Sequence, residues 1–490
     1  MNFFKKNKWI LIVLTLNLAI VFYPTLFMSL PITQTDGLTY YGIAETFAET
    51  GDFFAEIPDY LSVKWEEGVY INEFLPVPTL YLAAFIKFFG EKVAFNGGAI
   101  GLLFVFSNLY LYLLASKFVP KKAALLVTLF GILNFRFYYL LWGGNWANVF
   151  AMLFSVPAIY YFWNFLEKNR NRDFGLMVLF LFFAAGSHTV HYLFTVFLMS
   201  GMWFGVKVFK NTKIKLPEIK LKFGDPDKNW LKVGNRTLAI SIIVFFATFV
   251  PFALAGARTK WVTEWIDYLM QMNKVPEFWH WGIISDGPIL IVLAVLGVIY
   301  AFYKQNWGLL GIAIPSYVMI CLTKFLVPDE IWLSLFVYRY QAFHFIILGL
   351  LAVYFVFDFI KTHPKSKKLL ITLLILSMTW QTAKTGALMY KIEPAITEDE
   401  LAAAEYLKET GEEFWLINNV NTWSSFRSYE WILAYGDGNK NNLSFEVDEK
   451  ALEAPYILVQ DISALTNSEQ IMLEKRGMIW DQGTVAIYKK

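Results

Sequence analysis

The sequence predicts an α-helical, multi-pass membrane protein that ends in a small α/β domain. Hydrophobic residues make up 57% of the chain and aromatic residues 19%, whereas only 17% are charged. A bilayer is crossed by about 20 consecutive apolar residues, and this chain contains many such runs. Its end differs in composition, because residues 391–490 carry 9 Lys and Arg against 18 Asp and Glu although the whole chain has a net charge of +2. We therefore expect a membrane domain over 1–390 and an acidic α/β domain over 391–490. No basic soluble domain is present that would favour nucleic acid as a partner.

The first apolar run is interpreted as a retained membrane helix. Three lysines within the first eight residues precede it, and it extends from Trp9 to Leu30. This length exceeds the core of a signal peptide, and no small-residue cleavage motif follows. The chain has a single cysteine, Cys321, which excludes an intrachain disulfide and a cysteine-based metal site.

The distribution of positive charge predicts how the chain crosses the plasma membrane. Lys and Arg are enriched in cytoplasmic loops. With the N-terminus in the cytoplasm, positive charge falls at every inward end and the C-terminal domain lies outside the cytoplasm. Residues 31–92 then form a large external loop, in which 74–90 is placed as a helix along the outer interface, and 261–272 is interpreted in the same way. The eleven expected spans are 9–30, 94–118, 123–141, 146–166, 174–188, 190–207, 237–256, 288–303, 307–326, 337–360 and 369–388.

Local patterns in the C-terminal hundred residues predict alternating helices and strands. Thr397 followed by Glu400 is the pattern of a capping box that opens a helix to about Lys408. Residues 414–417 and 456–460 have the composition of strands, and 477–488 that of a hairpin around Asp481-Gln482-Gly483.

Polar residues on the predicted external side are the candidates for a functional site. Membrane proteins rarely keep ionisable groups at this level without a use for them. We single out two carboxylates of the first loop and five further side chains from later external turns. These are Asp36 and Glu73, then Asn145, His188, His191, Arg258 and Arg339.

Such a set suits the transfer of a sugar from a lipid-linked phosphate. A carboxylate takes the proton of the acceptor hydroxyl as that hydroxyl attacks the anomeric carbon. The leaving phosphate needs positive charge from Arg, Lys or a divalent metal such as Mg²⁺ or Mn²⁺. In this scheme Asp36 is the base or a metal ligand, and Glu73 positions the acceptor or the metal. Arg339 or Arg258 binds the phosphate.

Each assignment has a structural alternative. Asp36 is equally the type of residue that caps a helix or lies solvated in a loop. His188 and His191 are compatible with hydrogen-bonded turn residues, and their spacing suits a metal only with help from a carboxylate. Arg339, at a membrane boundary, is able to extend its charged head to water.

Several segments resemble the GT-C superfamily of polytopic membrane glycosyltransferases. The segment Asp36-Gly-Leu-Thr-Tyr-Tyr-Gly-Ile-Ala-Glu-Thr-Phe-Ala-Glu-Thr-Gly-Asp52 is similar to the family's Asp-containing first loop and short helix. Glu73-Phe-Leu-Pro-Val-Pro-Thr-Leu-Tyr81 is similar to the segment before its juxtamembrane helix. The external turns Trp142-Gly-Gly-Asn-Trp-Ala-Asn148 and Ser187-His-Thr-Val-His191 resemble those of uncharacterised prokaryotic, often archaeal, members, and Tyr338-Arg-Tyr340 opens a late span.

The resemblance implies a base or metal ligand at Asp36 and a second acidic residue at Glu73. The chain also departs from the family's subgroups. Gly37 stands where protein mannosyltransferases have the second residue of an Asp-Glu pair, and the Trp-Trp-Asp-Tyr-Gly motif of oligosaccharyltransferases is absent from the sequence. Phe74 stands where aminoarabinose-transferase-like members have a lysine.

The expected function is that of an inverting membrane glycosyltransferase. It would move a sugar from a polyprenyl-phosphate carrier to an extracytoplasmic glycan, lipid or protein. A transporter or flippase of lipid-linked sugars is the first alternative, and it would place charges near the middle of the membrane and broken spans in matching halves. A non-catalytic envelope protein is the second, and it would tolerate substitution of Asp36 and Glu73.

Overall fold

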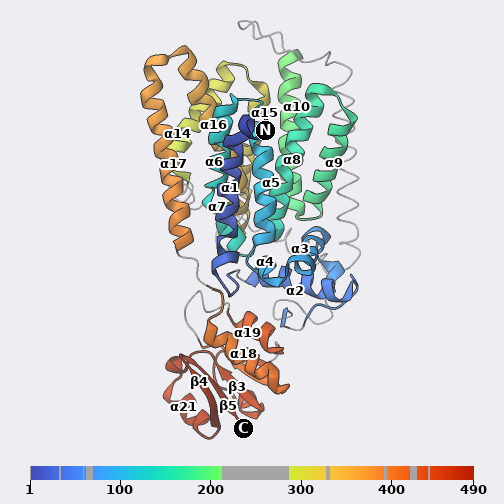
Figure 1. Ribbon diagram of the computed structural model, residues 1–490, viewed down its shortest axis with the longest axis vertical. Coiled ribbons are helices and arrows are strands. Elements are labelled where there is room, and N and C mark those ends of the chain that lie inside the picture. Colours follow the sequence, from blue (N-terminus) through green and yellow to red (C-terminus); the bar gives the residue numbers. More distant parts are fainter. Residues whose placement is uncertain are drawn as a thin grey trace. The chain divides into compact units, whose positions relative to one another are not determined.

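The computed structural model describes most of the chain as helices and one sheet (Figure 1). It describes residues 2–32, 35–58, 60–61, 70–211, 286–326, 332–390, 394–419, 428–439 and 442–490. The helices are α1 (Asn2–Phe27), α2 (Thr35–Thr50), η2 (Ile71–Glu73), α3 (Pro76–Phe89), α4 (Glu91–Phe95), α5 (Gly98–Ala115), α6 (Lys121–Ile132), α7 (Phe135–Trp142), α8 (Trp146–Lys168), α9 (Asn171–Ala185), α10 (Thr189–Asn211), α14 (Pro288–Tyr303), α15 (Trp307–Leu326), α16 (Trp332–Thr362), η3 (Pro364–Ser366), α17 (Lys367–Tyr390), α18 (Glu398–Thr410), α19 (Ser428–Gly436), α20 (Glu449–Glu453), η6 (Ile462–Ala464) and α21 (Asn467–Glu474). The strands are β1 (Phe414–Ile417), β2 (Leu443–Ser444), β3 (Tyr456–Val459), β4 (Gly477–Gln482) and β5 (Val485–Lys489).

The described chain divides into two compact units. The first contains Met1–Val21, Ile100–Leu140 and Ala147–Lys391, which hold nearly all the long apolar helices. The second contains Phe22–Ala99, Leu141–Trp146 and Ile392–Lys490. The first loop and the C-terminal segment, far apart in sequence, thus belong to the same compact unit.

The helices confirm a multi-pass membrane protein. Five segments of the described chain are long and apolar enough to cross a bilayer: Lys8–Phe27, Gly98–Ala115, Lys121–Trp142, Trp146–Lys168 and Tyr340–Thr362. Helices also lie at the expected spans 174–188, 190–207, 288–303, 307–326 and 369–388. The expected span 237–256 and the expected interfacial segment 261–272 lie outside the described residues, so the number eleven stays a prediction.

The expected single span 123–141 is broken in the middle. Helix α6 ends at Ile132 and α7 begins at Phe135. Asn134 occupies the break, where its side-chain oxygen accepts the N–H of Phe137 (3.3 Å) and its amide nitrogen donates to the carbonyl of Ala342 in α16 (2.7 Å). Thr385 of α17 donates to the carbonyl of Leu133 (3.0 Å). The side chains of Thr385 and of Asn134 itself thus satisfy backbone groups that a break within the membrane would otherwise leave unpaired.

Small residues bring helices of the first unit into close contact. Helices α10 and α15 cross at Gly201 and Gly311, where a β-carbon added to Gly311 would lie 2.6 Å from the Cα of Met202. Without side chains at these positions the two backbones approach closely and gain van der Waals contact, which drives helix association in lipid.

In the second unit, the two described helices of the first loop, α2 and α3, pack together as a helical hairpin. Helix α2 packs against α3, and α3 has 14 residues, or about 21 Å of helix, which is too short for a hydrocarbon core of about 30 Å. Asn96, after α4, closes the hairpin onto the end of the first span by accepting the N–H of Ile32 (3.2 Å) and donating to the carbonyl of Met28 (3.4 Å).

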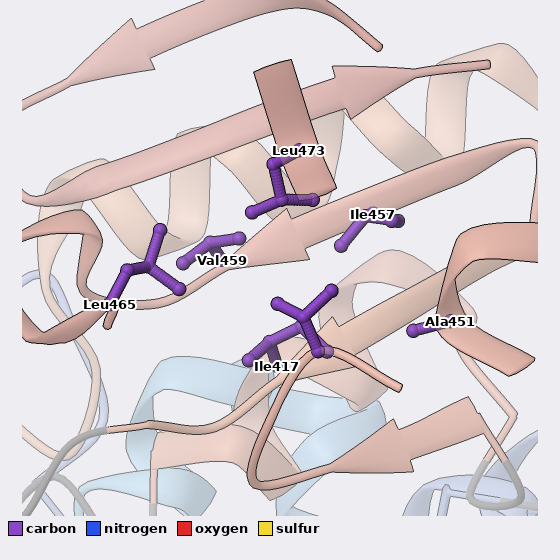
Figure 2. Packing of buried hydrophobic residues seen from close by; sticks show 7 residues of the cluster. Ile417, Ala451, Ile457, Val459, Leu465 and Leu473 are labelled. Carbon is purple, nitrogen blue, oxygen red and sulfur yellow. The ribbon is translucent and has the colours of Figure 1, made fainter. Parts of the chain in front are cut away.

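The C-terminal segment contains a five-stranded sheet in the order β2-β1-β3-β5-β4. Strands β1 to β3 are parallel, and β5 pairs antiparallel with both β3 and β4. The core of one face is aliphatic and joins strands β1 and β3 to α20 and α21 (Figure 2). The predicted capping box at Thr397, the strands at 414–417 and 456–460, and the hairpin around Asp481–Gly483 are confirmed.

Candidate functional site

Asp36 is the second residue of α2, at the beginning of the first-loop helix. Its side chain lies outside the described part of the structure, but the backbone around it is firmly held. Before it, Asn96 bonds both Met28 and Ile32, and after it Leu38 and Ile43 are fully buried. A carboxylate at a helix start also lies where the helix dipole favours negative charge.

Glu73 lies outside α2, in a segment bonded close to the C-terminal end of that helix. It ends η2, and its side chain too lies outside the described part. The preceding residue, Asn72, donates its N–H to the carbonyl of Phe53 (2.8 Å), just beyond the end of α2. Because α2 extends about 21 Å from Asp36 to Thr50, the two backbone positions are well separated along the helix.

Helix α2 carries a second carboxylate, Glu45, that is half-buried. Tyr41 donates its hydroxyl to Glu45 Oε1 (2.8 Å). Burial raises the pKa of Glu45, and the Tyr41 hydrogen bond and the neighbouring Glu91 act with smaller, opposing effects. The two glutamates of α2 thus differ in environment. Glu45 is half-buried, whereas Glu49, one turn later, is exposed.

The turns predicted to bind substrate lie at helix ends. Asn145 lies in the turn between α7 and α8, half-buried, with its amide donating to the carbonyl of Gly143 (3.4 Å). His188 immediately precedes α10, and its Nδ1 accepts the N–H of His191 (3.4 Å). The two imidazole rings lie edge to face, 5.8 Å apart between centroids, and His191 is 3% exposed.

Aromatic contacts connect His191 to Tyr340 of α16. His191 contacts Phe194, and Phe194 packs on Tyr340 with 4.4 Å between ring centroids. Tyr340 directly follows Arg339, whose backbone lies in α16 and whose side chain lies outside the described part. The structure therefore brings His191 close to the residue after Arg339, within the first unit. Arg258 lies outside the described residues.

A buried polar cluster that the sequence reasoning missed joins α7, α16 and α17. Arg136 of α7 donates to Asp286 Oδ1 (2.8 Å) and to the side-chain oxygen of Gln341, one residue after Tyr340. Arg136 is 1% and Asp286 5% exposed. Gln381 of α17 donates to the carbonyl of Asp286 (2.7 Å). An arginine inside the apolar run 123–141 was the available sequence signal, since ionisable residues within spans are rare and usually functional.

A hydrogen-bonded chain lies beside this cluster. Tyr340 donates to Ser316 Oγ (3.2 Å), which is 2.7 Å from His344 Nδ1, and both Ser316 and His344 are buried. Helices α15 and α16 are thus joined by polar side chains close to the break between α6 and α7.

The structure leaves the expected metal untested. Within the described residues, no three His, Cys, Asp or Glu side chains come together in a way that could hold a metal ion. The carboxylates of Asp36 and Glu73 lie outside the described part of the structure, so a metal at Asp36 stays a prediction.

Comparison with solved structures identifies the fold. The chain superposes over 98% of its length, and 98% of the other chain, on ArnT from Cupriavidus metallidurans bound to undecaprenyl phosphate, with 11% identity and a TM-score of 0.60. The chain has the GT-C fold.

The GT-C fold is also shared with an archaeal oligosaccharyltransferase. Against the enzyme from Archaeoglobus fulgidus tethered to an acceptor peptide containing a sequon, the chain is 12% identical over 98% of its length and 73% of the other chain, with a TM-score of 0.57. Another structure of the Archaeoglobus fulgidus enzyme, with an inhibitory peptide and a dolichol-phosphate, gives 13% identity and a TM-score of 0.57. No protein-family model matches the sequence, and comparison with curated protein sequences finds no match.

Proposed function

We propose that this protein is an inverting membrane glycosyltransferase that transfers a sugar from a polyprenyl-phosphate carrier to an extracytoplasmic acceptor. The observation that carries the proposal is the GT-C fold along the whole chain, with Asp36 at the beginning of the first-loop helix. GT-C neighbours of this chain were solved with undecaprenyl phosphate and with dolichol-phosphate, which supports a lipid-phosphate donor.

In the proposed reaction, the acceptor hydroxyl loses its proton to Asp36 as its oxygen bonds to the anomeric carbon. The bond from that carbon to the phosphate oxygen breaks, and the electron pair leaves with the polyprenyl phosphate. Attack opposite to the leaving group inverts the anomeric configuration. Arg339 or Arg258 stabilises the charge that develops on the phosphate.

The remaining residues are assigned by their places in the structure. Asn145 lies in the turn before α8, His188 directly precedes α10 and His191 lies in the first turn of α10. We assign these three residues to substrate binding. Glu73, beside the far end of α2, contacts the acceptor rather than the reacting phosphate. An Archaeoglobus fulgidus neighbour was solved with Zn and sulfate. A divalent metal at Asp36 would supply Lewis acidity to the leaving phosphate.

The proposal includes the orientation of the chain. The N-terminus lies in the cytoplasm, eleven helices cross the plasma membrane, and residues 391–490 form an extracytoplasmic α/β domain. The parallel strands β1–β3 and the acidic composition of this segment fit a soluble domain.

The test is a donor panel. Purified protein in lipid nanodiscs is given polyprenyl phosphates carrying different sugars, with and without divalent metal, and release of the free carrier phosphate is measured. Carrier release that requires acceptor and yields the inverted anomer supports the proposal. Absence of release with every donor, in protein whose helices are intact, contradicts it.

A transporter of lipid-linked sugars is the second candidate function. The buried Arg136–Asp286 pair beside the broken span α6–α7 favours it, because transporters place charges and interrupted helices within the membrane. Movement of labelled lipid-linked sugar between leaflets of proteoliposomes, without release of the carrier, would select this function.

A further inference from the structure

The C-terminal segment holds the helix that carries Asp36 on both sides of this residue. Upstream, Ala395 donates its N–H to the carbonyl of Pro31 (2.7 Å), five positions before Asp36. Downstream, Trp431 of α19 packs on Tyr41, five positions after Asp36, with 6.0 Å between ring centroids and 35° between the rings. All of these residues belong to the second unit.

The downstream contact is a closed aromatic cluster. Phe95 of α4 meets Tyr41 edge-on at 6.1 Å and Trp431 edge-on at 6.4 Å between centroids, so the three rings contact one another in pairs. Trp431 is 1%, Tyr41 6% and Phe95 7% exposed. Edge-to-face ring pairs of this kind are attractive beyond the effect of their buried area alone.

Trp431 is itself fixed from within the C-terminal segment. It stacks on Tyr435 one turn later at 5.9 Å, and Ile432 and Leu433 beside it are fully buried. Helix α19 packs on α18, which the Thr397 capping box anchors. Packing contacts therefore connect the sheet to the first-loop helix through α18 and α19.

We infer that Trp431 is a positioning residue for Asp36, so that the C-terminal segment sets the geometry of the reacting carboxylate. The inference rests on the proposed function for the role of Asp36, but the contact itself does not. Since displacement of about 1 Å costs catalysis heavily, loosening α2 lowers turnover without removing any group that touches substrate.

The experiment combines hydrogen–deuterium exchange with kinetics on the full chain in nanodiscs. Trp431→Ala is compared with Trp431→Phe, which keeps an aromatic ring, and with Phe445→Ala, which truncates an aromatic side chain that is 56% exposed on the same segment. For Trp431→Ala we expect exchange of the α2 amides to rise about tenfold or more and kcat to fall at least tenfold. KM for the donor stays within twofold, Trp431→Phe recovers most of kcat, and Phe445→Ala behaves as wild type.

A second pair of variants covers the case in which Trp431→Ala unfolds the segment. Ala395→Pro removes the N–H that bonds Pro31, whereas Ala395→Gly keeps it. Faster α2 exchange and lower kcat in Ala395→Pro alone support the inference. Unchanged α2 exchange in both Trp431→Ala and Ala395→Pro overturns it, as does faster exchange with unchanged kcat. If wild-type protein transfers no sugar, the proposed function fails, and the exchange data still decide whether the C-terminal segment holds α2.

Discussion

Replacing Asp286 by alanine should destabilise the first unit strongly, because it leaves Arg136 charged in a buried site. Arg136 is 1% exposed and its bond to Asp286 is 2.8 Å long. Removing one partner of a buried ion pair costs about 3–5 kcal/mol, far more than the pair contributes when both partners are present. Lys384 lies close enough to attract Asp286 and to repel Arg136. Loss of the carboxylate therefore leaves two positive charges near each other, and we expect a cost at the upper end of this range.

The free energy of unfolding is measured in mixed detergent micelles by intrinsic fluorescence. Lys361→Ala is the control, because it breaks an ion pair with Asp358 in which Lys361 is 59% exposed, for an expected cost below about 1 kcal/mol. The double variant Arg136→Met/Asp286→Leu should recover most of the stability, since it leaves no unpaired charge. A cost for Asp286→Ala no larger than that of Lys361→Ala would refute the reasoning, and so would a double variant as unstable as the single one.

Three further predictions test separate parts of the structure. Gly311→Ala should lower the free energy of unfolding by about 1–3 kcal/mol, because its β-carbon would meet the backbone of α10. Gly175→Ala, whose β-carbon would have nothing within 4 Å, should be neutral or stabilising. Equal thermal midpoints for the two variants would contradict this prediction. Burial raises the pKa of Glu45 in the folded protein, so the folded state is penalised as pH rises through that pKa. Glu45→Gln should therefore raise the thermal midpoint at pH 8 and lose this advantage near pH 4. A thermal midpoint below that of wild type at pH 8 would contradict the prediction. Thr397→Ala should lower the stability of α18 by about 1 kcal/mol, because it removes the cap bonded to the N–H of Glu400. The loss should appear as faster amide exchange in α18, and unchanged exchange there would exclude a stabilising cap.

The sequence predicted the elements whose causes are local. Apolar runs and positive loops located the helices, and the capping box at Thr397 and the turn at Asp481–Gly483 depend on neighbouring residues. The break at Asn134 was not predicted, because Asn134 and Arg136 are only two strongly polar residues in the otherwise largely apolar run 123–141. It is stabilised by Ala342 and Thr385, which lie more than two hundred positions away.

The sequence named candidate site residues, and the structure shows how some of the described ones group together. His188 and His191 were expected together because they are neighbours on one turn, and the structure places them in ring contact. Arg136 was passed over as part of an apolar span, and its partners Asp286 and Gln341 come from other helices. Pairings of this kind depend on helix packing, which no single segment of sequence encodes.

The most direct test of the central claim is turnover by Asp36→Asn. Release of polyprenyl phosphate is compared for wild type, Asp36→Asn and Glu49→Gln, the last removing an exposed carboxylate from the same helix, with donor binding measured in parallel. A general base contributes about 10²–10⁴-fold, so we predict at least a hundredfold loss of kcat in Asp36→Asn, retained donor binding, and wild-type turnover in Glu49→Gln. Equal turnover in Asp36→Asn and wild type would contradict the assignment of Asp36 as the base and direct attention to Glu73 and the histidine turn.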